Sequence, residues 1–242
     1  MATFKKNGLD ILFGDRSLSC ASDTAEHAGG IAPLMGDEPY KTIAHELETD
    51  KLIFAHQVHG TGALFIDKLA DADRYMRHFY DADIIITKVP DIAVGLLTAD
   101  CLPLILFDGE HGILAAVHAG WRGTVKNAAG AAVEKMVEMG AQADEIFAYF
   151  GPCAHAAEYA ASPELIAALG DSPYRESVLE KREDRLYFDM PRMNELQLIA
   201  AGILPGSISR EYCKDTLTDD AFWSYRRDGE QAERQPTCTV FR

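Results

Sequence analysis

The sequence predicts an α/β (α+β mixed) fold in which mixed β-sheets pack with helices, and two features of the 242-residue chain support this prediction. Short apolar segments dense in β-branched residues recur between Gly, Pro and Asp, which is typical of strands. Other segments carry apolar residues at the 3.6-residue spacing of a helix. The strands expected between residues 84 and 119 follow one another closely, and helices and strands alternate afterwards. This order favours layered, mixed sheets over a regular doubly wound sheet.

Seven segments are predicted as strands because each is short, apolar and bounded by turn-forming residues. In chain order they are LIFAHQVH (52–59), ADIIIT (82–87), IAVGLL (92–97), LPLILFD (102–108), GILAAVHA (112–119), EIFAYFG (145–151) and SISREYC (207–213). The turn DGEHG lies between the fourth and fifth segments, so these two strands are expected to run antiparallel.

Three segments are predicted as helices. Residues 124–140 carry apolar side chains at 125, 128, 129, 132, 133, 136 and 137, which form one face of a helix that ends at Gly140. Residues 162–170 begin with Ser-Pro-Glu and end on glycine, and residues 190–203 have a similar apolar stripe. No linker, repeat or low-complexity tract divides the chain, so we expect a single domain over residues 1–242.

The composition restricts the class of partner. The formal net charge of −15 opposes binding to nucleic-acid phosphates and to anionic lipid, because both depend on Lys and Arg. No stretch reaches the roughly 18 apolar residues that cross a bilayer, and the N-terminus lacks the apolar segment of a signal peptide. We therefore expect a cytoplasmic protein, monomer or homodimer, that binds a small molecule and neither nucleic acid nor membrane.

The five cysteines, Cys20, Cys101, Cys153, Cys213 and Cys238, are odd in number, widely spaced and without a CxxC pair. This pattern argues against a disulfide framework and against a zinc ribbon. Reduced thiols are expected, and the core is the usual location of a free thiol.

Residues with chemical potential concentrate between positions 53 and 123. In TADCLPLILFDGEHGILAAVHAGWRG, Cys101 stands at the entrance of one apolar strand and His118 near the exit of the next. Two antiparallel strands joined by a short turn would bring both side chains to the same end of the sheet. The segment HQVHG (56–60) places two more histidines, His56 and His59, near the end of an earlier strand.

Three interpretations of these residues are open. His118 could take the proton of Cys101 and leave a thiolate nucleophile, as in cysteine hydrolases. Alternatively, both could bind a soft or borderline cation such as zinc, with a histidine of HQVHG as the third ligand and an open fourth position. They could also be ordinary core residues. The segment HAGWRG favours function, because its small residues and glycines permit a close approach of the backbone.

Five motifs resemble those of the laccase-domain family, also called YfiH-like or polyphenol-oxidase-like proteins. They are HQVHG, TADCLPLIL, VHAGWRG, FGPC and FWSYRRDG, in the expected order. The resemblance implies a metal-binding and catalytic site of His59, Cys101 and His118, with zinc or, less expected, copper as the metal. It also implies one domain with sheets between helices in α/β/β/α layers. His56 is not expected to be a ligand, because the family motif aligns on the second histidine.

The resemblance also implies an activity, because members of this family are characterised as purine nucleoside phosphorylases that act on adenosine, inosine and methylthioadenosine, with adenosine deamination alongside. Copper-dependent polyphenol oxidation is disfavoured, since the chain has eight histidines and no HxH motif. Arginine suits phosphate binding, so the candidate substrate-binding residues are Arg16, Arg122 and Arg226, together with Asp100. Around Arg16 the chain reads FGDRSLS and lacks the glycine pair of the family pattern.

Two other functions stay open. Cys101 could be the nucleophile of a Cys-His hydrolase, in cell-wall peptide editing or protein deamidation. A structural zinc in an interaction protein is the third hypothesis, although structural zinc sites usually have four protein ligands and the motifs offer three. Zinc analysis and an assay of adenosine with phosphate would separate the zinc enzyme from the hydrolase.

Overall fold

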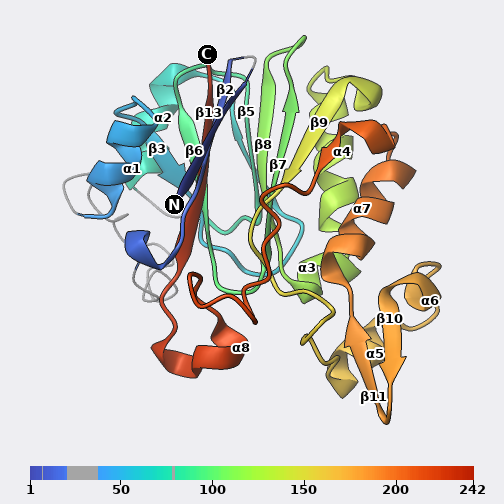
Figure 1. Ribbon diagram of the computed structural model, residues 1–242. Helices are drawn as coiled ribbons and strands as arrows, with labels where there is room; N and C mark the ends of the chain where they lie inside the picture. The colour runs from blue at the N-terminus through green and yellow to red at the C-terminus, as the bar shows by residue number, and fades with distance from the viewer. Residues whose placement is uncertain (7, 21–37, 78–79) are drawn as a thin grey trace.

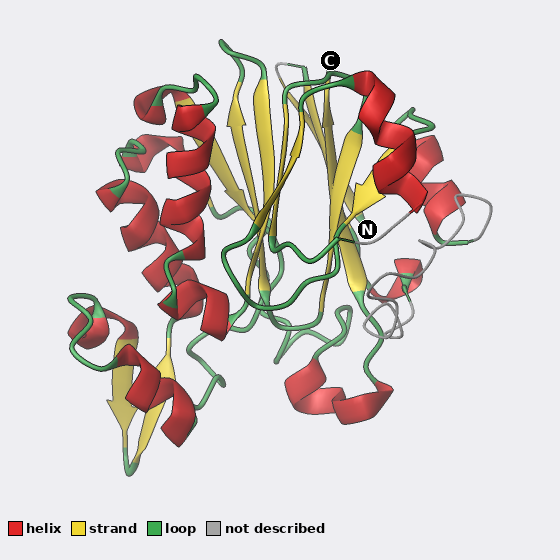
Figure 2. Ribbon diagram, turned by 180° about the vertical axis from the view of Figure 1, so that it is seen from behind, coloured by secondary structure: helices red, strands yellow, loops and turns green. Residues whose placement is uncertain are grey.

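Figure 1 shows the computed structural model, which describes residues 1–6, 8–20, 38–77 and 80–242. Two mixed β-sheets lie face to face with helices on both outer sides, as the views from opposite directions show (Figure 1, Figure 2). Helix α1 (Tyr40–Glu46) covers one outer side, and helices α4 (Ala128–Glu138) and α7 (Met190–Ala200) cover the other. The predicted α/β class and the α/β/β/α layers are confirmed.

The first sheet has five strands in the order β1-β2-β13-β6-β3. Their bounds are β1 (Ala2–Lys6), β2 (Leu9–Phe13), β13 (Gln235–Phe241), β6 (Ala93–Thr98) and β3 (Leu52–Phe54). Strands β3 and β6 are parallel, and the other three pairs are antiparallel. The two ends of the chain therefore meet in this sheet, where β13 lies between β2 and β6.

The second sheet has six strands in the order β12-β9-β7-β8-β5-β4. Their bounds are β12 (Ile208–Ser209), β9 (Ile146–Phe150), β7 (Leu102–Asp108), β8 (Ile113–Ala119), β5 (Ile84–Thr87) and β4 (Ala63–Ile66). The pairs β12/β9 and β4/β5 are parallel, and the three central pairs are antiparallel. The antiparallel β7/β8 hairpin expected from the DGEHG turn is present.

Both faces of the central strands are buried, so successive residues of one such strand enter different cores. In β5, Ile84 and Ile86 pack with residues of α4 and α7, whereas Ile85 packs between the two sheets. On the outer face of the first sheet, Leu52 of β3 packs with Ile43 of α1. Three apolar layers thus hold four layers of secondary structure together, which explains why the strands read as continuous apolar runs.

Smaller elements complete the described part of the chain. The remaining α-helices are α2 (Leu69–Arg77), α3 (Trp121–Val125), α5 (Pro163–Leu169), α6 (Arg175–Val178) and α8 (Tyr225–Asp228). A hairpin of β10 (Leu179–Arg182) and β11 (Arg185–Phe188) projects from the body beside α5 and α6 (Figure 1). Among the residues that the structure describes, no helix has the length and apolar character required to traverse a bilayer.

All seven predicted strand segments contain a strand, but two strands are shorter than expected. Residues 52–59 form a strand at Leu52–Phe54, and residues 207–213 at Ile208–Ser209. The helix predicted over 124–140 begins instead at Ala128, because Asn127 adopts a left-handed conformation with φ of 66° and separates α3 from α4. The other two predicted helices are present as α5 and α7.

Candidate functional site

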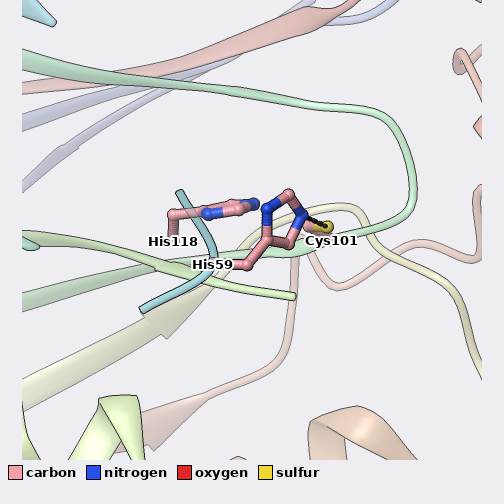
Figure 3. Close-up of side chains that lie close together, drawn as sticks. All are labelled: His59, Cys101 and His118. Carbon is pink, nitrogen blue, oxygen red and sulfur yellow. Dashed lines mark hydrogen bonds between the residues drawn. The ribbon is translucent and has the colours of Figure 1, made fainter. Parts of the chain in front are cut away.

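Three side chains that are far apart in the sequence, His59, Cys101 and His118, converge beyond one end of the β7/β8 hairpin (Figure 3). Each contributes a donor atom, and these atoms all lie within 4.8 Å of one another. Cys101 Sγ is 3.8 Å from His59 Nε2, and the two imidazole rings meet edge to face with centroids 4.8 Å apart. One thiol and two imidazoles are therefore close enough to hold a single ion. We call these three residues the cluster.

Strand pairing explains why Cys101 and His118 meet. Strands β7 and β8 are antiparallel, and Pro103 pairs with His118 across them. Cys101 directly precedes β7, so it lies at the end of the hairpin where His118 also lies. The sequence predicted this placement of Cys101 and His118 at the same end of two antiparallel strands. His59 reaches the same place from the loop after β3, where its backbone adopts a positive φ of 59°.

Asp83 orients both histidines, and sequence reasoning missed it. Its Oδ1 lies 2.8 Å from His118 Nδ1 and accepts a hydrogen bond from the backbone N–H of His59 at 2.9 Å, while Oδ2 accepts one from the N–H of Gly60 at 2.6 Å. Because Nδ1 of His118 is engaged, Nε2 is the nitrogen left to bind a ligand. One signal in the sequence could have indicated Asp83: an acidic residue directly before the apolar run IIIT is unusual, because a charged side chain beside a buried strand requires a polar partner.

The backbone beside the cluster has room only for glycine. A Cβ at Gly120 would lie 2.7 Å from Cys101 Sγ and 2.9 Å from His59 Cδ2, both well inside ordinary contact distance. Zinc and copper both accept thiolate and imidazole ligands. Zinc-ligand bonds of about 2.0 to 2.3 Å in a tetrahedral site place neighbouring donor atoms about 3.4 to 3.8 Å apart. The donor chemistry of the cluster therefore fits a bound metal ion, and the distance of 3.8 Å between Cys101 Sγ and His59 Nε2 lies at the upper end of this range.

Electrostatics favours a charged thiolate in the cluster. Burial raises the pKa of Cys101, but the positive charge of His118 and hydrogen bonds with both histidines outweigh burial and lower that pKa to about 6. Burial lowers the pKa of His118, but the negative charges of Cys101 and Asp83 outweigh burial and raise that pKa to about 9. A thiolate is the form of cysteine that binds a metal or attacks an electrophile.

A pocket of about 540 Å³ includes all three cluster residues in its wall. The rest of the wall includes three aromatic rings and three arginines: Trp121, Tyr159, Tyr225, Arg122, Arg226 and Arg234. Each guanidinium lies over one of these rings, at 4.3 to 5.8 Å from its centroid. The pocket thus combines flat apolar surfaces with positive charge in a protein whose formal net charge is −15.

Three of the four residues predicted to bind substrate, Asp100, Arg122 and Arg226, line this pocket. Asp100 is buried, and its two carboxylate oxygens accept hydrogen bonds from Thr216 Oγ1 and from the backbone N–H of Arg226, both at 2.7 Å. Arg122 donates two hydrogen bonds to the Glu164 carboxylate, and both side chains are exposed. Asp100 therefore positions the chain around the pocket, while the two guanidinium groups stand at its surface.

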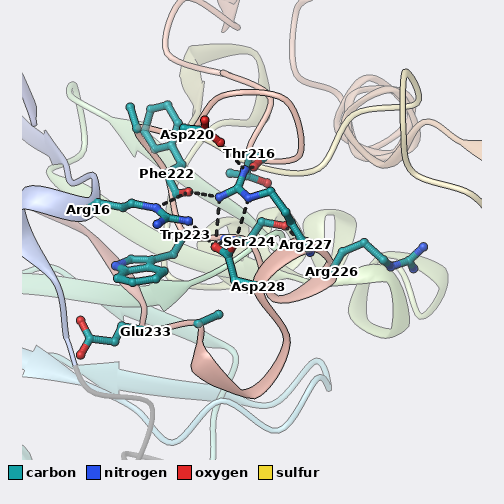
Figure 4. A network of polar contacts seen from close by, with 12 residues as sticks. Arg16, Thr216, Asp220, Phe222, Trp223, Ser224, Arg226, Arg227, Asp228 and Glu233 are labelled. Carbon is teal, nitrogen blue, oxygen red and sulfur yellow. Dashed lines mark hydrogen bonds and ion pairs between the residues drawn. The ribbon is translucent and has the colours of Figure 1, made fainter.

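The fourth predicted residue, Arg16, is not in the pocket wall. Its Nε donates to the carbonyl of Phe222 at 3.0 Å, its guanidinium pairs with Asp228, and its charge lies 4.1 Å from the ring centroid of Trp223 (Figure 4). Arg227 pairs with the same carboxylate at 2.9 Å. Arg16 thus connects the N-terminal part of the chain to the segment that precedes β13.

His56, the first histidine of HQVHG, lies in the pocket wall but outside the cluster. Its Nδ1 is 2.8 Å from Asp81 Oδ1, so a carboxylate on the neighbouring segment holds the ring. The structure agrees with the expectation that His59, rather than His56, meets Cys101 and His118.

Residues 36–242 match the family model described as multi-copper polyphenol oxidoreductase laccase. A purine nucleoside phosphorylase from Deinococcus radiodurans is 36% identical over 156 residues, which cover 64% of this chain and 60% of that protein, less than two thirds of its length. A protein named adenosine deaminase RL5, from an unknown prokaryotic organism, is 30% identical over 201 residues, which cover 80% of this chain and 77% of the relative.

The solved structures include a similar fold. The hypothetical protein YfiH from Bacillus licheniformis matches with a TM-score of 0.81 and 22% identity, and the match covers 98% of this chain and 94% of that protein. At 22% identity this match shows that the two proteins share a fold, and it shows nothing about the chemistry of the pocket.

Proposed function

Because the chain belongs to the family described as multi-copper polyphenol oxidoreductase laccase, with relatives named purine nucleoside phosphorylase and adenosine deaminase, we propose that it is a zinc-dependent purine nucleoside phosphorylase. Adenosine, inosine and methylthioadenosine are the proposed substrates, with adenosine deamination as a second activity. The observation that carries the proposal is the cluster of one thiol and two imidazoles in the wall of a pocket that also offers aromatic rings and arginines. The five cysteines of the chain are free thiols, which supports a cytoplasmic location.

The cluster supplies the proposed zinc ligands. His59, Cys101 and His118 would hold the ion, and zinc with three protein ligands keeps one open position at which it acts as a Lewis acid. Asp83 fixes the ring of His118 through Nδ1 and fixes the loop of His59 through its backbone N–H. The chain thereby orients two ligands with one buried carboxylate, as is usual for metal-bound histidines.

The remaining wall residues match the two substrates of phosphorolysis. A purine base is flat and apolar on its faces, so Trp121, Tyr159 and Tyr225 offer surfaces on which it can stack. Phosphate is an anion with several oxygens, and guanidinium groups bind two of them at once. Arg226 is the favoured phosphate ligand, because Arg122 must first leave the Glu164 carboxylate.

Phosphorolysis requires phosphate to attack the sugar carbon as the base leaves with its bonding electrons and takes up a proton. A pocket that holds both reactants beside each other supplies much of the rate enhancement by orientation alone. The guanidinium groups neutralise the attacking anion, which otherwise meets the negative field of an acidic protein.

The test is an assay of metal-loaded, reduced protein with adenosine. With phosphate we expect adenine and ribose 1-phosphate in equal amounts, and without phosphate we expect neither. Formation of inosine without phosphate reports the deaminase activity. If zinc-loaded protein leaves adenosine, inosine and methylthioadenosine intact in the presence of phosphate, the proposal is wrong.

A second candidate is a Cys-His hydrolase, and one geometric feature favours it. Cys101, His118 and Asp83 follow one another as thiol, imidazole and carboxylate, the order of groups in a nucleophilic triad. In such an enzyme metal-free protein would be active and an amide-directed electrophile would label Cys101. Zinc binding would inhibit it, whereas zinc is required by the phosphorylase.

Multi-copper oxidation does not fit this chain, although its family is described as multi-copper polyphenol oxidoreductase laccase. A multi-copper centre needs many histidine ligands close together, and the full sequence contains eight histidines and no HxH motif. Of these eight, His59 and His118 belong to the cluster.

A further inference from the structure

A second group of donor side chains lies outside the pocket: Cys153, His155 and Cys213. The two sulfur atoms are 3.7 Å apart, and Cys213 Sγ is 3.4 Å from His155 Nε2. All three donor atoms lie within 4.8 Å of one another. Both cysteines are buried free thiols, and the imidazole is half-buried.

The sulfur-sulfur distance of 3.7 Å and the sulfur-nitrogen distance of 3.4 Å match the geometry of a tetrahedral zinc site. With zinc-sulfur bonds of about 2.3 Å and a zinc-nitrogen bond of about 2.0 to 2.1 Å, two thiolates lie about 3.8 Å apart and a thiolate and an imidazole nitrogen about 3.6 Å apart. We propose that Cys153, His155 and Cys213 form a second metal site that binds a zinc ion. It is separate from the cluster and does not depend on the proposed enzymatic activity.

The backbone holds the donors in place without the ion. Cys153 lies in the segment that follows β9, and Cys213 in the segment that follows β12. The N–H of Cys153 donates to the carbonyl of Lys214 at 2.9 Å, and the N–H of Thr216 donates to the carbonyl of Cys153 at 3.0 Å. The two segments therefore meet in a short parallel bridge between Cys153 and Asp215, which holds both thiols on adjacent segments and lowers the conformational cost of binding an ion.

An ordinary apolar core explains this group less well. Cys153 and Cys213 pack among apolar residues of the helix-covered sheet face, where aliphatic side chains would fill the space without polar atoms. Instead, His155 directs Nε2 at a thiol, while its backbone N–H donates to Asp215 Oδ1 at 3.2 Å. The group thus supplies two soft sulfur donors, one imidazole and a neighbouring carboxylate, which are the surroundings that a divalent cation requires.

The group lies apart from the pocket, beside two segments that hold Asp100 in place. None of its three residues is in the wall of the 540 Å³ pocket. The N–H of Ala154 donates to the carbonyl of Asp100 at 2.9 Å, and Thr216 Oγ1 donates to the carboxylate of Asp100 at 2.7 Å. An ion bound by Cys153 and Cys213 would therefore hold together the two segments that donate hydrogen bonds to Asp100. Asp100 directly precedes Cys101 in the chain. The group offers three protein ligands, so the fourth position stays open to a water molecule beside the half-buried His155.

Native mass spectrometry of tag-free, fully reduced protein after exposure to Zn²⁺ tests this proposal by counting bound ions. We expect two ions in the unaltered protein, one in Cys101→Ala and one in His155→Ala, and none in the double variant. His155→Ala is preferred to replacement of a buried thiol because it disturbs the core least. Cys20→Ala, which removes a buried free thiol outside both groups, is the matched control and should keep two ions.

Affinity gives a second readout. Replacement of a residue that hydrogen-bonds to a metal ligand typically lowers metal affinity by about 10- to 100-fold. His155→Ala removes a ligand itself, so it should lower the zinc affinity of this group by at least that factor. One ion in the reduced unaltered protein, absent from Cys101→Ala, would overturn this proposal and leave the proposed function untouched. Two ions in His155→Ala with unchanged affinities, or uptake of Cu⁺ but not Zn²⁺ at this group, would also overturn it.

Discussion

Replacement of Gly120 by alanine tests the geometry of the cluster without removing any ligand. The added Cβ would lie 2.7 Å from Cys101 Sγ, whereas nonbonded heavy atoms normally approach to about 3.5 to 4.0 Å. The sulfur must therefore move by about 1 Å, and metal-ligand distances tolerate only about 0.2 Å. Gly120 has φ of −68° and ψ of 168°, a conformation that alanine adopts freely, so backbone strain is not expected.

We expect Gly120→Ala to weaken zinc binding by the cluster by about 10- to 100-fold, the loss typical of disturbed ligand support. This corresponds to about 1.4 to 2.8 kcal/mol. The assay is a zinc titration against a chromophoric chelator, in a His155→Ala background in which the second group binds zinc at least about 10- to 100-fold more weakly. Phosphorolysis of adenosine at limiting zinc should fall in parallel.

Gly123→Ala is the matched control. A Cβ at Gly123 would meet its nearest atoms at 3.4 to 3.6 Å, which is ordinary contact, and alanine favours the helical conformation of α3. We expect unchanged zinc affinity for this control. Wild-type zinc affinity in a folded Gly120→Ala protein would show that the added methyl group does not displace the donor atoms, or that these atoms do not bind the ion.

Three further predictions follow from individual contacts. Asp83→Asn should lower zinc affinity by about 10- to 100-fold, because the neutral amide holds His118 less strongly than the carboxylate does; equal affinity in the same titration would contradict this role. Arg226→Ala should raise the KM for phosphate about tenfold or more, with a smaller effect on kcat and on the KM for adenosine, as expected for loss of a charged hydrogen bond; an unchanged KM for phosphate would assign the anion to another residue. Burial raises the pKa of Cys20 to about 12, above the ordinary thiol pKa of about 8.5. The neutral thiol therefore makes its full contribution to the stability of the folded state below about pH 8.5, and this contribution is lost as the pH rises toward 12. The thermal melting temperature of Cys20→Ala should therefore fall less steeply with pH between about 9 and 11 than that of the unaltered protein, and an identical slope would show that folding does not raise the pKa of this thiol.

The central strands were predictable because their signals are local. LPLILFD and GILAAVHA are apolar, short and separated by a turn, and the antiparallel pairing of β7 with β8 follows from that turn. The same hairpin brings Cys101 and His118 together, so this half of the cluster could be expected from the sequence. That these residues bind a metal stays a prediction.

The rest depends on contacts between distant parts of the chain. Strand β13 lies between β2 and β6, and it contains Pro236, a residue that usually argues against an interior strand. Asp83 is adjacent to His118 only through the pairing of β5 with β8, and no local pattern in ADIIIT indicates that partner. Arg16 was assigned to the substrate because arginine suits phosphate, but the carboxylate of Asp228 is what it meets in the fold.

The proposed function requires that His59, Cys101 and His118 hold one metal ion in the pocket wall. Anomalous diffraction from crystals of the zinc-loaded protein, measured above and below the zinc absorption edge, tests it most directly. We expect a zinc peak about 2.3 Å from Cys101 Sγ and about 2.0 to 2.1 Å from an imidazole nitrogen of each histidine. Active protein whose crystals show no anomalous peak between these three side chains would contradict it.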